Sequence, residues 1–329
     1  MHRFRIVVLA VMATLLAFPA RCPAPIIYRP GEGWETKGSA IAAATPKDQL
    51  EQGKEFEKVR NWNDAMASYR MLLKRWPTSI HAGEAQFRVG YCQEQQRDYY
   101  RAFLSYQKVA ESYQGFDKFD ELIQRQYKIG NLFLAGERVK FFFIKTFPSM
   151  DRAVEIYEKV IKNAPYSDIA PSAQMAIGYA REKQKKFDEA VAAYQKLIEK
   201  YPRSSLAEEA YFNIGLAYYR AATRSEYDQG YANKAVDAFN EYRAKFPGGS
   251  KLDIAREHIT KVQTDQARGL FEVARFYDKQ KELTAALVYY NELIARHPKS
   301  SYCEEAKQRV EVLRRLAALK PAPNPEEKK

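Results

Sequence analysis

The sequence predicts an all-α fold, a right-handed superhelix (α-solenoid) of about six helical hairpins. Small residues, alanines, aromatic residues and prolines recur in the same order along most of the chain. The 329 residues include only 15 glycines and 15 prolines, too few for an all-β protein with many tight turns. Apolar residues make up 46% of the chain, which is enough to bury a core and argues against a disordered chain.

The recurring pattern is a small residue, an alanine 12 positions later, an aromatic residue four positions after that, and a proline eight positions further on. Four units keep this spacing, with Gln114 in place of the proline in the second; they begin at Gly53, Gly90, Gly178 and Ala274. Two more units, which begin at Gly130 and Gly215, lengthen the first interval by 11 and 8 residues. Six units in one register are therefore expected.

Helix–turn–helix packing explains the spacing. We expect the small residue of helix A and the alanine of helix B where the two helices cross closely, because a larger side chain would push the axes apart. The aromatic residue shares the face of the alanine, and we expect its ring to fill the gap toward the next unit. The proline ends helix B because it cannot continue the hydrogen-bond ladder.

Several residues have the properties of helix N-termini. Thr45 can cap a helix, Pro46 suits its first position, and the charge of Asp48 suits its first turn. Asn61 stands before helix B of the first unit. Two further pairs have the spacing of a capping box, Ser205 with Glu208 and Ser301 with Glu304.

The N-terminal segment, residues 1–22, has the features of an export signal. Arg3 and Arg5 precede an apolar stretch of 12 residues at 6–17, which suits a secretory signal and is too short to span a bilayer. Cys22 is a candidate for lipidation, which would make this a lipoprotein signal, although a bulky arginine precedes the cysteine. A retained N-terminal anchor is the alternative. Both place the rest of the chain outside the cytoplasm.

Three segments come after the signal. Residues 23–46 hold four prolines and three glycines without a helical period and are expected to form an extended arm. Residues 47–316 form the repeat domain. Residues 317–329 are rich in proline and charge, and we expect a disordered tail.

The repeat spacing resembles that of the tetratricopeptide repeat, over about residues 47–316. A narrower resemblance begins with a proline-free stretch at 252–278, which predicts one long helix. Together with the residues after it, this stretch resembles the C-terminal unit of BamD-like proteins, and the resemblance is closest in 203–316. It rests on Glu272, Val273, Ala274, Phe276, Tyr277, Ala286, Tyr290, Pro298 and Ser300.

BamD-like proteins are outer-membrane lipoproteins of Gram-negative bacteria that serve β-barrel protein assembly. The resemblance implies a periplasmic scaffold at the outer membrane, with C-terminal units that hold the barrel-inserting channel and N-terminal units that meet unfolded barrel substrates. One alternative is another envelope adaptor, linked to peptidoglycan or division. A second is an accessory subunit of an enzyme or of a secretion machine.

No motif for catalysis is found in the sequence. There is no H-E-x-x-H and no G-x-S-x-G, and the histidines lack the spacing of a helical metal site. We therefore expect no enzyme activity, no cofactor and no metal. Cys92 and Cys303 are expected to be buried free thiols. The net charge, 53 − 41 = +12, could indicate nucleic acid, but an export signal favours anionic lipid or acidic partner segments; plain solubility is the alternative.

Two surfaces are candidates for partner binding. The family geometry places helix A positions one, four and five after the small residue in the concave groove, and the candidates are Lys54, Lys58, Tyr91, Glu94, Asn131, Tyr179, Glu182, Tyr219, Arg220 and Arg275. Packing between repeats is the alternative role for the tyrosines. The second candidate is hydrophobic docking at Phe141, Phe142, Phe143 and Phe147 in the unit-three insertion. The alternative is burial of these residues on a long helix A that begins near Phe119.

Overall fold

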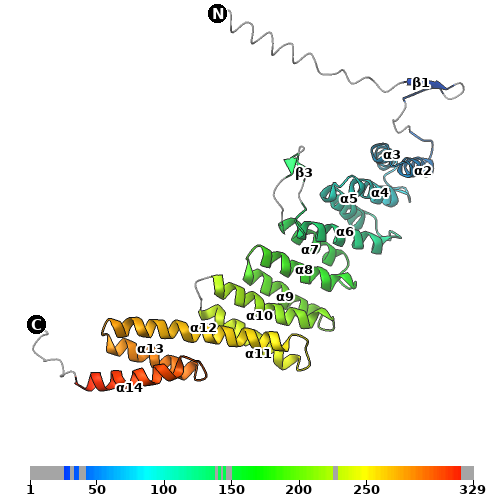
Figure 1. Ribbon diagram of the computed structural model, residues 1–329. Coiled ribbons are helices and arrows are strands. Elements are labelled where there is room, and N and C mark those ends of the chain that lie inside the picture. The colour runs from blue at the N-terminus through cyan, green and yellow to red at the C-terminus, as the bar shows by residue number, and fades with distance from the viewer. Residues whose placement is uncertain are drawn as a thin grey trace, which may run out of the picture. The chain divides into compact units, whose positions relative to one another are not determined.

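The structure, a computed structural model, describes residues 26–29, 33–36, 42–137, 140–141, 144–145, 150–224 and 229–319. The predicted export signal with Cys22 lies outside these residues, as does most of the predicted tail. The chain forms two compact units, residues 1–122 and 123–329. Both are built from consecutive helical hairpins, so the chain is all-α, as the sequence predicts (Figure 1).

The first unit contains two hairpins within its described residues. They consist of α2 (Pro46–Lys58) with α3 (Trp62–Arg75), and α4 (Ala82–Gln95) with α5 (Tyr99–Ser112). Each helix packs on the next one in the chain, including α3 on α4. Each hairpin is thereby stacked on its neighbour in the sequence, which is the arrangement that repeat proteins use to bury a continuous core.

The second unit contains four hairpins and a final helix among its described residues. The hairpins are α6 (Phe119–Leu134, which begins just before the boundary) with α7 (Met150–Asn163), α8 (Ile169–Lys183) with α9 (Phe187–Lys200), α10 (Leu206–Arg224) with α11 (Gln229–Lys245), and α12 (Leu252–Lys279) with α13 (Leu283–Arg296). Helix α14 (Cys303–Leu319) comes last and packs on α13. The 28-residue α12 is the long helix that the sequence predicts. Helix α14 continues three residues past 316, the predicted end of the repeats.

Two short antiparallel strand pairs stand outside the helical stack. Strand β1 (Ile26–Arg29) pairs with β2 (Gly33–Thr36), and Ile26 lies opposite Thr36. Strand β3 (Lys140–Phe141) pairs with β4 (Ile144–Lys145) in the unit-three insertion. Helix α6 ends at Leu134, so the long helix A offered as the alternative for the phenylalanine run does not reach these residues.

The five glycines of the pattern occupy equivalent places, each under the ring of the aromatic residue in its own hairpin. A Cβ atom added at Gly53 would lie 2.3 Å from the ring of Tyr69, and one added at Gly178 would lie 2.1 Å from the ring of Tyr194. The same pairing joins Gly90 with Tyr106, Gly130 with Tyr157, and Gly215 with Phe239. Each ring thus fills the place of the missing Cβ within its own unit. Tyr69 and Tyr194 also share core clusters with residues of the next unit, as the sequence predicts.

The alanines of the pattern lie in the core as predicted. All six are fully buried, namely Ala65, Ala102, Ala153, Ala190, Ala235 and Ala286. The prolines also fall where the pattern requires. In each unit that has one, helix B ends two residues before the proline, as α9 ends at Lys200 before Pro202. A pyrrolidine ring there prevents the helix from continuing.

The turn between helices A and B uses a basic residue in the left-handed conformation. This position has a φ between 56° and 61° in four units, at Arg60, Arg97, Lys185 and Lys281. In the first, the next N–H, of Asn61, donates to the carbonyl oxygen of Phe56 at 2.9 Å and closes the end of α2. This is the hydrogen bond of a Schellman-type helix end, where glycine is the usual residue.

The start of α2 agrees with the sequence. The hydroxyl oxygen of Thr45 accepts a hydrogen bond from the backbone N–H of Asp48 at 3.1 Å, and Pro46 is the first helical residue. The hydrogen bonds at the two predicted capping boxes differ from the prediction. The serines that accept backbone hydrogen bonds at those helix starts are Ser204 and Ser300, each from the N–H two residues later at 3.2 Å. The carboxylate of Glu208 instead accepts the hydroxyl of Tyr242 at 2.9 Å.

Replacing the cap residue, Thr45→Ala, is expected to lower the free energy of unfolding of the first unit by about 1 kcal/mol, because the N–H of Asp48 loses its acceptor at the end of a helix. Urea unfolding followed by circular dichroism measures this change. Thr45→Ser keeps a hydroxyl and serves as the control. An unchanged midpoint for Thr45→Ala would show that water replaces the cap at no cost.

Candidate interaction surfaces

A polar contact between a tyrosine, a carboxylate and an arginine recurs along the stack. In the first unit, the hydroxyl of Tyr69 on α3 donates to Glu57 on α2 at 2.7 Å. The other oxygen of Glu57 accepts from Arg88 on α4, also at 2.7 Å. Burial and then the bond to Glu57 raise the pKa of Tyr69, so its hydroxyl remains a donor. The carboxylate thus joins the two helices of one hairpin to the first helix of the next.

The same arrangement occurs in the second unit. The hydroxyl of Tyr194 on α9 donates to Glu182 on α8 at 2.6 Å, and Arg220 on α10 pairs with the same carboxylate. Further along, Arg309 on α14 binds both oxygens of Asp278 on α12, at 2.5 and 2.7 Å. Bidentate arginine–carboxylate contacts of this kind fix geometry as well as charge. These carboxylates therefore set the spacing between successive hairpins.

Three predicted groove residues take part in such contacts. Glu94 accepts the hydroxyl of Tyr106 at 2.8 Å, and Asn131 accepts that of Tyr157 at 2.6 Å. Glu182 belongs to the contact described above. Their polar atoms are thereby held inside the repeat stack. Sequence reasoning missed this role, although a signal exists: the carboxylates at 57, 94, 182 and 278 all stand 12 positions before the tyrosine of the pattern.

The predicted groove tyrosines are half-buried and make contacts between neighbouring helices. Tyr179 donates to Glu209 at 2.9 Å, and burial raises its pKa to about 12. The ring of Tyr91 lies edge-on to Trp62, with 6.1 Å between centroids. The ring of Tyr219 lies 4.9 Å from that of His258 on α12, centroid to centroid.

The predicted basic groove residues differ in exposure. Lys54 pairs with Glu51 at 2.8 Å and with Glu84 on α4 at 3.4 Å, whereas the more exposed Lys58 pairs with Glu55 of its own helix at 2.6 Å. Arg220 pairs with Glu182, as above. The guanidinium of Arg275 lies 5.9 Å from the ring centroid of Phe271.

The ten predicted groove residues are distributed over both units, four in the first and six in the second. The partner-binding role of this set stays a prediction. So does hydrophobic docking at the phenylalanine run. Phe142, Phe143 and Phe147 lie outside the described residues, and for Phe141 the structure describes only the backbone, in β3.

A second feature that sequence reasoning missed is a buried glutamine four residues before the glycine of the pattern. The amide nitrogen of Gln174 donates to the backbone carbonyl of Ala193 on the partner helix at 3.0 Å. Gln86 binds Ser105 in the same way at 3.3 Å, and Gln49 donates to the hydroxyl of Ser68 at 2.7 Å. Because a buried amide requires partners, these bonds fix the register of helix A on helix B.

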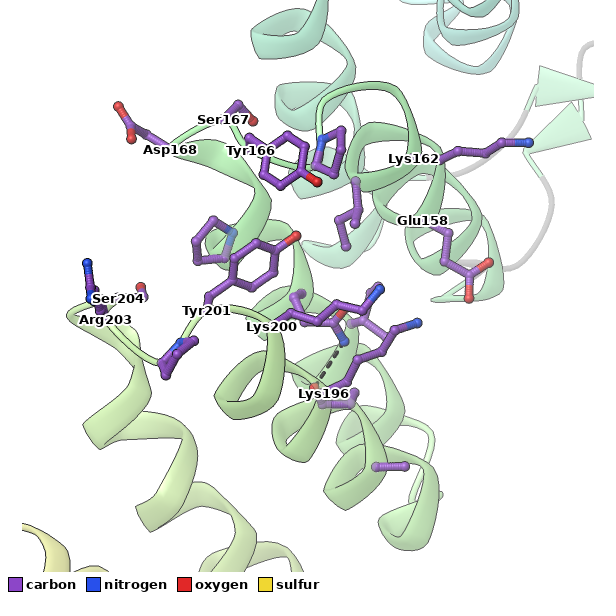
Figure 2. Close-up of a pocket in the computed structure, with 18 of the residues that line it drawn as sticks. Glu158, Lys162, Tyr166, Ser167, Asp168, Lys196, Lys200, Tyr201, Arg203 and Ser204 are labelled. Atoms are coloured by element: carbon purple, nitrogen blue, oxygen red, sulfur yellow. Dashed lines mark hydrogen bonds between the residues drawn. The ribbon is translucent and has the colours of Figure 1, made fainter.

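A large hollow lies between the helices B of two successive units. It has a volume of about 1710 Å³, and it lies between α7 and α9, with residues of α8 also in its lining. Figure 2 shows Lys196 and Lys200 extending from α9 into it, and Tyr166 and Tyr201 lying near each other on the loops at one end. We call this hollow the α7–α9 groove.

The described residues include two buried thiols and no cluster of possible metal ligands. No group of three or more histidine, cysteine or acidic side chains is arranged to hold a metal ion within the described part of the chain. Cys92 and Cys303 are buried free thiols, as the sequence predicts, and burial raises the pKa of Cys92 to about 12. None of the described helices combines the length and the apolar character needed to cross a membrane.

Comparison with known families gives two matches. The family YfiO, described as outer membrane lipoprotein, matches residues 147–292, and a tetratricopeptide repeat family matches residues 50–115. No curated protein matches the chain.

Several solved structures are similar to this chain. A tetratricopeptide repeat protein from Parabacteroides merdae is 13% identical, with 82% of this chain and 98% of that chain covered and a TM-score of 0.33. The C-terminal part of a TPR repeat-containing protein from Cytophaga hutchinsonii is 15% identical, with 80% and 87% covered and a TM-score of 0.35. PilW, described as a widely conserved type IV pilus biogenesis factor, is 14% identical, with 81% and 100% covered and a TM-score of 0.29.

Proposed function

We propose that this chain, a tetratricopeptide-repeat protein that resembles the BamD-like outer membrane lipoproteins, is a non-catalytic periplasmic scaffold at the outer membrane. Within that setting, its role is the assembly of outer-membrane β-barrel proteins through protein–protein contacts. The observation that carries the proposal is the match of residues 147–292 to the outer membrane lipoprotein family.

The architecture supports a scaffold. Stacked hairpins give a long surface relative to the length of chain, and each hairpin needs only its neighbours for stability. Polar contacts such as Tyr69–Glu57–Arg88 hold successive hairpins in a fixed relation, so side chains on the surface are presented in a pre-ordered array. A pre-ordered surface loses less entropy on binding a partner.

The N-terminal segment supports an envelope location. The charged and apolar regions of residues 1–22 suit export, and lipidation of Cys22 would attach the chain to a membrane. A lipid anchor and a protein contact together would hold the scaffold at the outer membrane more firmly than one acyl chain alone.

Affinity isolation from detergent-solubilised envelopes tests this function. The tagged full chain should recover a large β-barrel protein that carries periplasmic repeat domains. Recovery of peptidoglycan enzymes alone would favour the envelope-adaptor alternative, and recovery of a secretion apparatus would favour the accessory-subunit alternative. A chain without residues 1–22 should remain in the cytoplasm and recover none of these. Finding the full chain in the cytosol would remove the proposal.

The variant Cys22→Ser tests lipidation, because it should prevent membrane anchoring without preventing export. The variant should appear in the soluble periplasmic fraction while the parent chain appears in the outer-membrane fraction, because the thiol that would carry the acyl group is absent. Identical fractionation of the two chains would contradict lipidation at this residue and leave the scaffold role to be decided by the isolation experiment.

A further inference from the structure

The α7–α9 groove has the features of a binding site for an extended polypeptide segment. Its volume of about 1710 Å³ exceeds that of common small-molecule clefts, which measure about 300–1,000 Å³. Its lining includes Ile161 of α7, Ile177 of α8 and Ala192 of α9, so part of its surface is apolar. A groove of this size with apolar and charged walls can hold several consecutive residues of a partner.

The groove is lined by more basic than acidic side chains: Lys162, Arg181, Lys196, Lys200 and Arg203 against Glu158, Asp168 and Glu189. Lys196 and Lys200 extend into it from α9, and both are exposed (Figure 2). Neither lysine has an ion-pair partner among the residues that the structure describes. Glu189, which also lines the groove, is paired with Arg181 at 3.1 Å. Acidic side chains of a partner would therefore complement these lysines.

Two tyrosines give the groove an aromatic end. Tyr166 on the loop after α7 is 98% exposed, and Tyr201, which comes directly after α9, is half-buried nearby (Figure 2). A fully exposed tyrosine adds nothing to the packing of the stack. Tyrosine provides a large contact area at a low cost in side-chain entropy and is enriched at protein interfaces.

A smaller groove lies at the equivalent place in the first unit. It has a volume of about 550 Å³ and lies between α3 and α5, and each of its lining residues has a counterpart 88 positions later in the α7–α9 groove. Leu104 stands where the larger groove has Ala192 (192 − 104 = 88). The smaller side chain of Ala192 leaves more room at this point of the groove, and the larger groove also extends along the loops at Tyr166 and Tyr201. The smaller groove is lined by four basic residues and no acidic one: Arg70, Lys74, Arg101 and Lys108.

We propose that the α7–α9 groove binds an acidic polypeptide segment of a partner protein, in which small apolar residues meet Ala192 and the isoleucines while acidic residues meet Lys196 and Lys200. This inference goes beyond the scaffold role and does not depend on an outer-membrane location, because it concerns a groove of the purified chain. An anionic lipid surface shares the charge but not the shape, since a bilayer cannot enter a groove between two helices.

The test uses the purified full chain and a fluorescein-labelled ten-residue peptide of alternating glutamate and alanine, with binding followed by fluorescence anisotropy. A peptide with lysine in place of glutamate is the control ligand. The acidic peptide should bind, and binding should weaken as salt rises because exposed charges are screened over about 10 Å at 0.1 M ionic strength. Failure of the acidic peptide to bind more tightly than the basic one would overturn the proposal.

Charge reversal at the groove is compared with an equal reversal elsewhere. Lys196→Glu with Lys200→Glu should weaken peptide binding about tenfold or more, because two attractive contacts become repulsive. Lys299→Glu with Arg314→Glu, at exposed sites on other elements of the second unit, changes the net charge equally and should have little effect. Equal losses from both pairs would mean non-specific attraction to a basic protein and would overturn the proposal.

Ala192→Leu tests the shape of the groove without changing charge. The substitution reproduces Leu104 at an exposed helical position, so the fold is expected to tolerate it. Peptide binding should fall, whereas adsorption to vesicles of phosphatidylcholine with phosphatidylglycerol should not change. Unchanged peptide binding in this variant would place the peptide outside the groove. If reversing the charges of Lys196 and Lys200 abolished vesicle adsorption and no peptide bound, these lysines would be lipid-binding residues. That result would overturn the proposal.

Discussion

Gly178→Ala is expected to destabilise the second unit although alanine is the better helix former. Alanine in place of glycine within a helix gains about 1 kcal/mol. At this position the new methyl group would stand 2.1 Å from the ring of Tyr194, which is fully buried and cannot move aside. Overpacking of a core costs about 1–3 kcal/mol and can cost more at so short a distance. We expect a net loss of about 2 kcal/mol in the free energy of unfolding.

Gly269→Ala is the matched control. Gly269 lies in α12, and nothing stands within 4 Å of the place its Cβ would take. The same chemical change should therefore stabilise the chain by up to about 1 kcal/mol. Urea unfolding followed by circular dichroism compares the two variants. Because repeat proteins can unfold in parts, hydrogen exchange provides the local measurement, with faster exchange expected in α8 and α9 for Gly178→Ala.

The decisive result is that Gly178→Ala lowers the free energy of unfolding whereas Gly269→Ala raises it. If Gly178→Ala stabilised the chain as much as Gly269→Ala, the ring of Tyr194 would have to move freely, and close packing of ring on glycine would not explain the repeat. The same reasoning extends to Gly53, where the ring of Tyr69 lies 2.3 Å from the added Cβ.

The fold could be predicted because its strongest constraints are local in sequence. A glycine that must lie under a ring, and a proline that must come directly after a helix, permit few residue types at fixed distances. The hairpin can therefore be recognised in the sequence from the spacing of Gly178, Tyr194 and Pro202. The long α12 was predictable for the same reason, since no proline interrupts its 28 residues.

The contacts between hairpins were harder to predict because many residue types can make them. Glu57 meets Arg88 31 positions later, whereas Glu182 meets Arg220 38 positions later, because Arg88 stands two residues before the glycine of its unit and Arg220 stands five residues after the glycine of its own. A carboxylate on a helix is usually solvated, so only the recurrence of these carboxylates 12 positions before the tyrosine of the pattern separates them from the exposed ones. The turn residue Arg60 was missed because glycine is the usual residue at a left-handed helix end.

The α7–α9 groove was also beyond the sequence analysis, which placed partner binding on helices A. Ala192 and Tyr166 line it, and neither residue is marked by the repeat pattern. A missing side chain has no signature in a single sequence. Its effect is seen only when the equivalent groove, narrowed by Leu104, is placed beside it.

Glu57→Ala is expected to cost the first unit about 2 kcal/mol. Tyr69 is fully buried, and its hydroxyl would lose its acceptor, a loss of about 1–3 kcal/mol for a buried donor. Removing one partner of a buried ion pair can cost about 3–5 kcal/mol. That upper range should not be reached, because Arg88 retains a second carboxylate, Glu84, at 3.0 Å. Glu57→Gln keeps an acceptor for the tyrosine and should lose less.

Glu55→Ala, two residues away on the same helix, separates this contact from the general effect of removing a carboxylate. The side chain of Glu55 is 63% exposed, and its one ion pair among the described residues is with Lys58, so its loss should change the free energy of unfolding by less than about 0.5 kcal/mol. A chain with both Tyr69→Phe and Glu57→Ala should be less destabilised than the sum of the single variants, because the two residues share one bond. Simple additivity, or equal effects of Glu57→Ala and Glu55→Ala, would mean that the carboxylate does not hold the hairpins together.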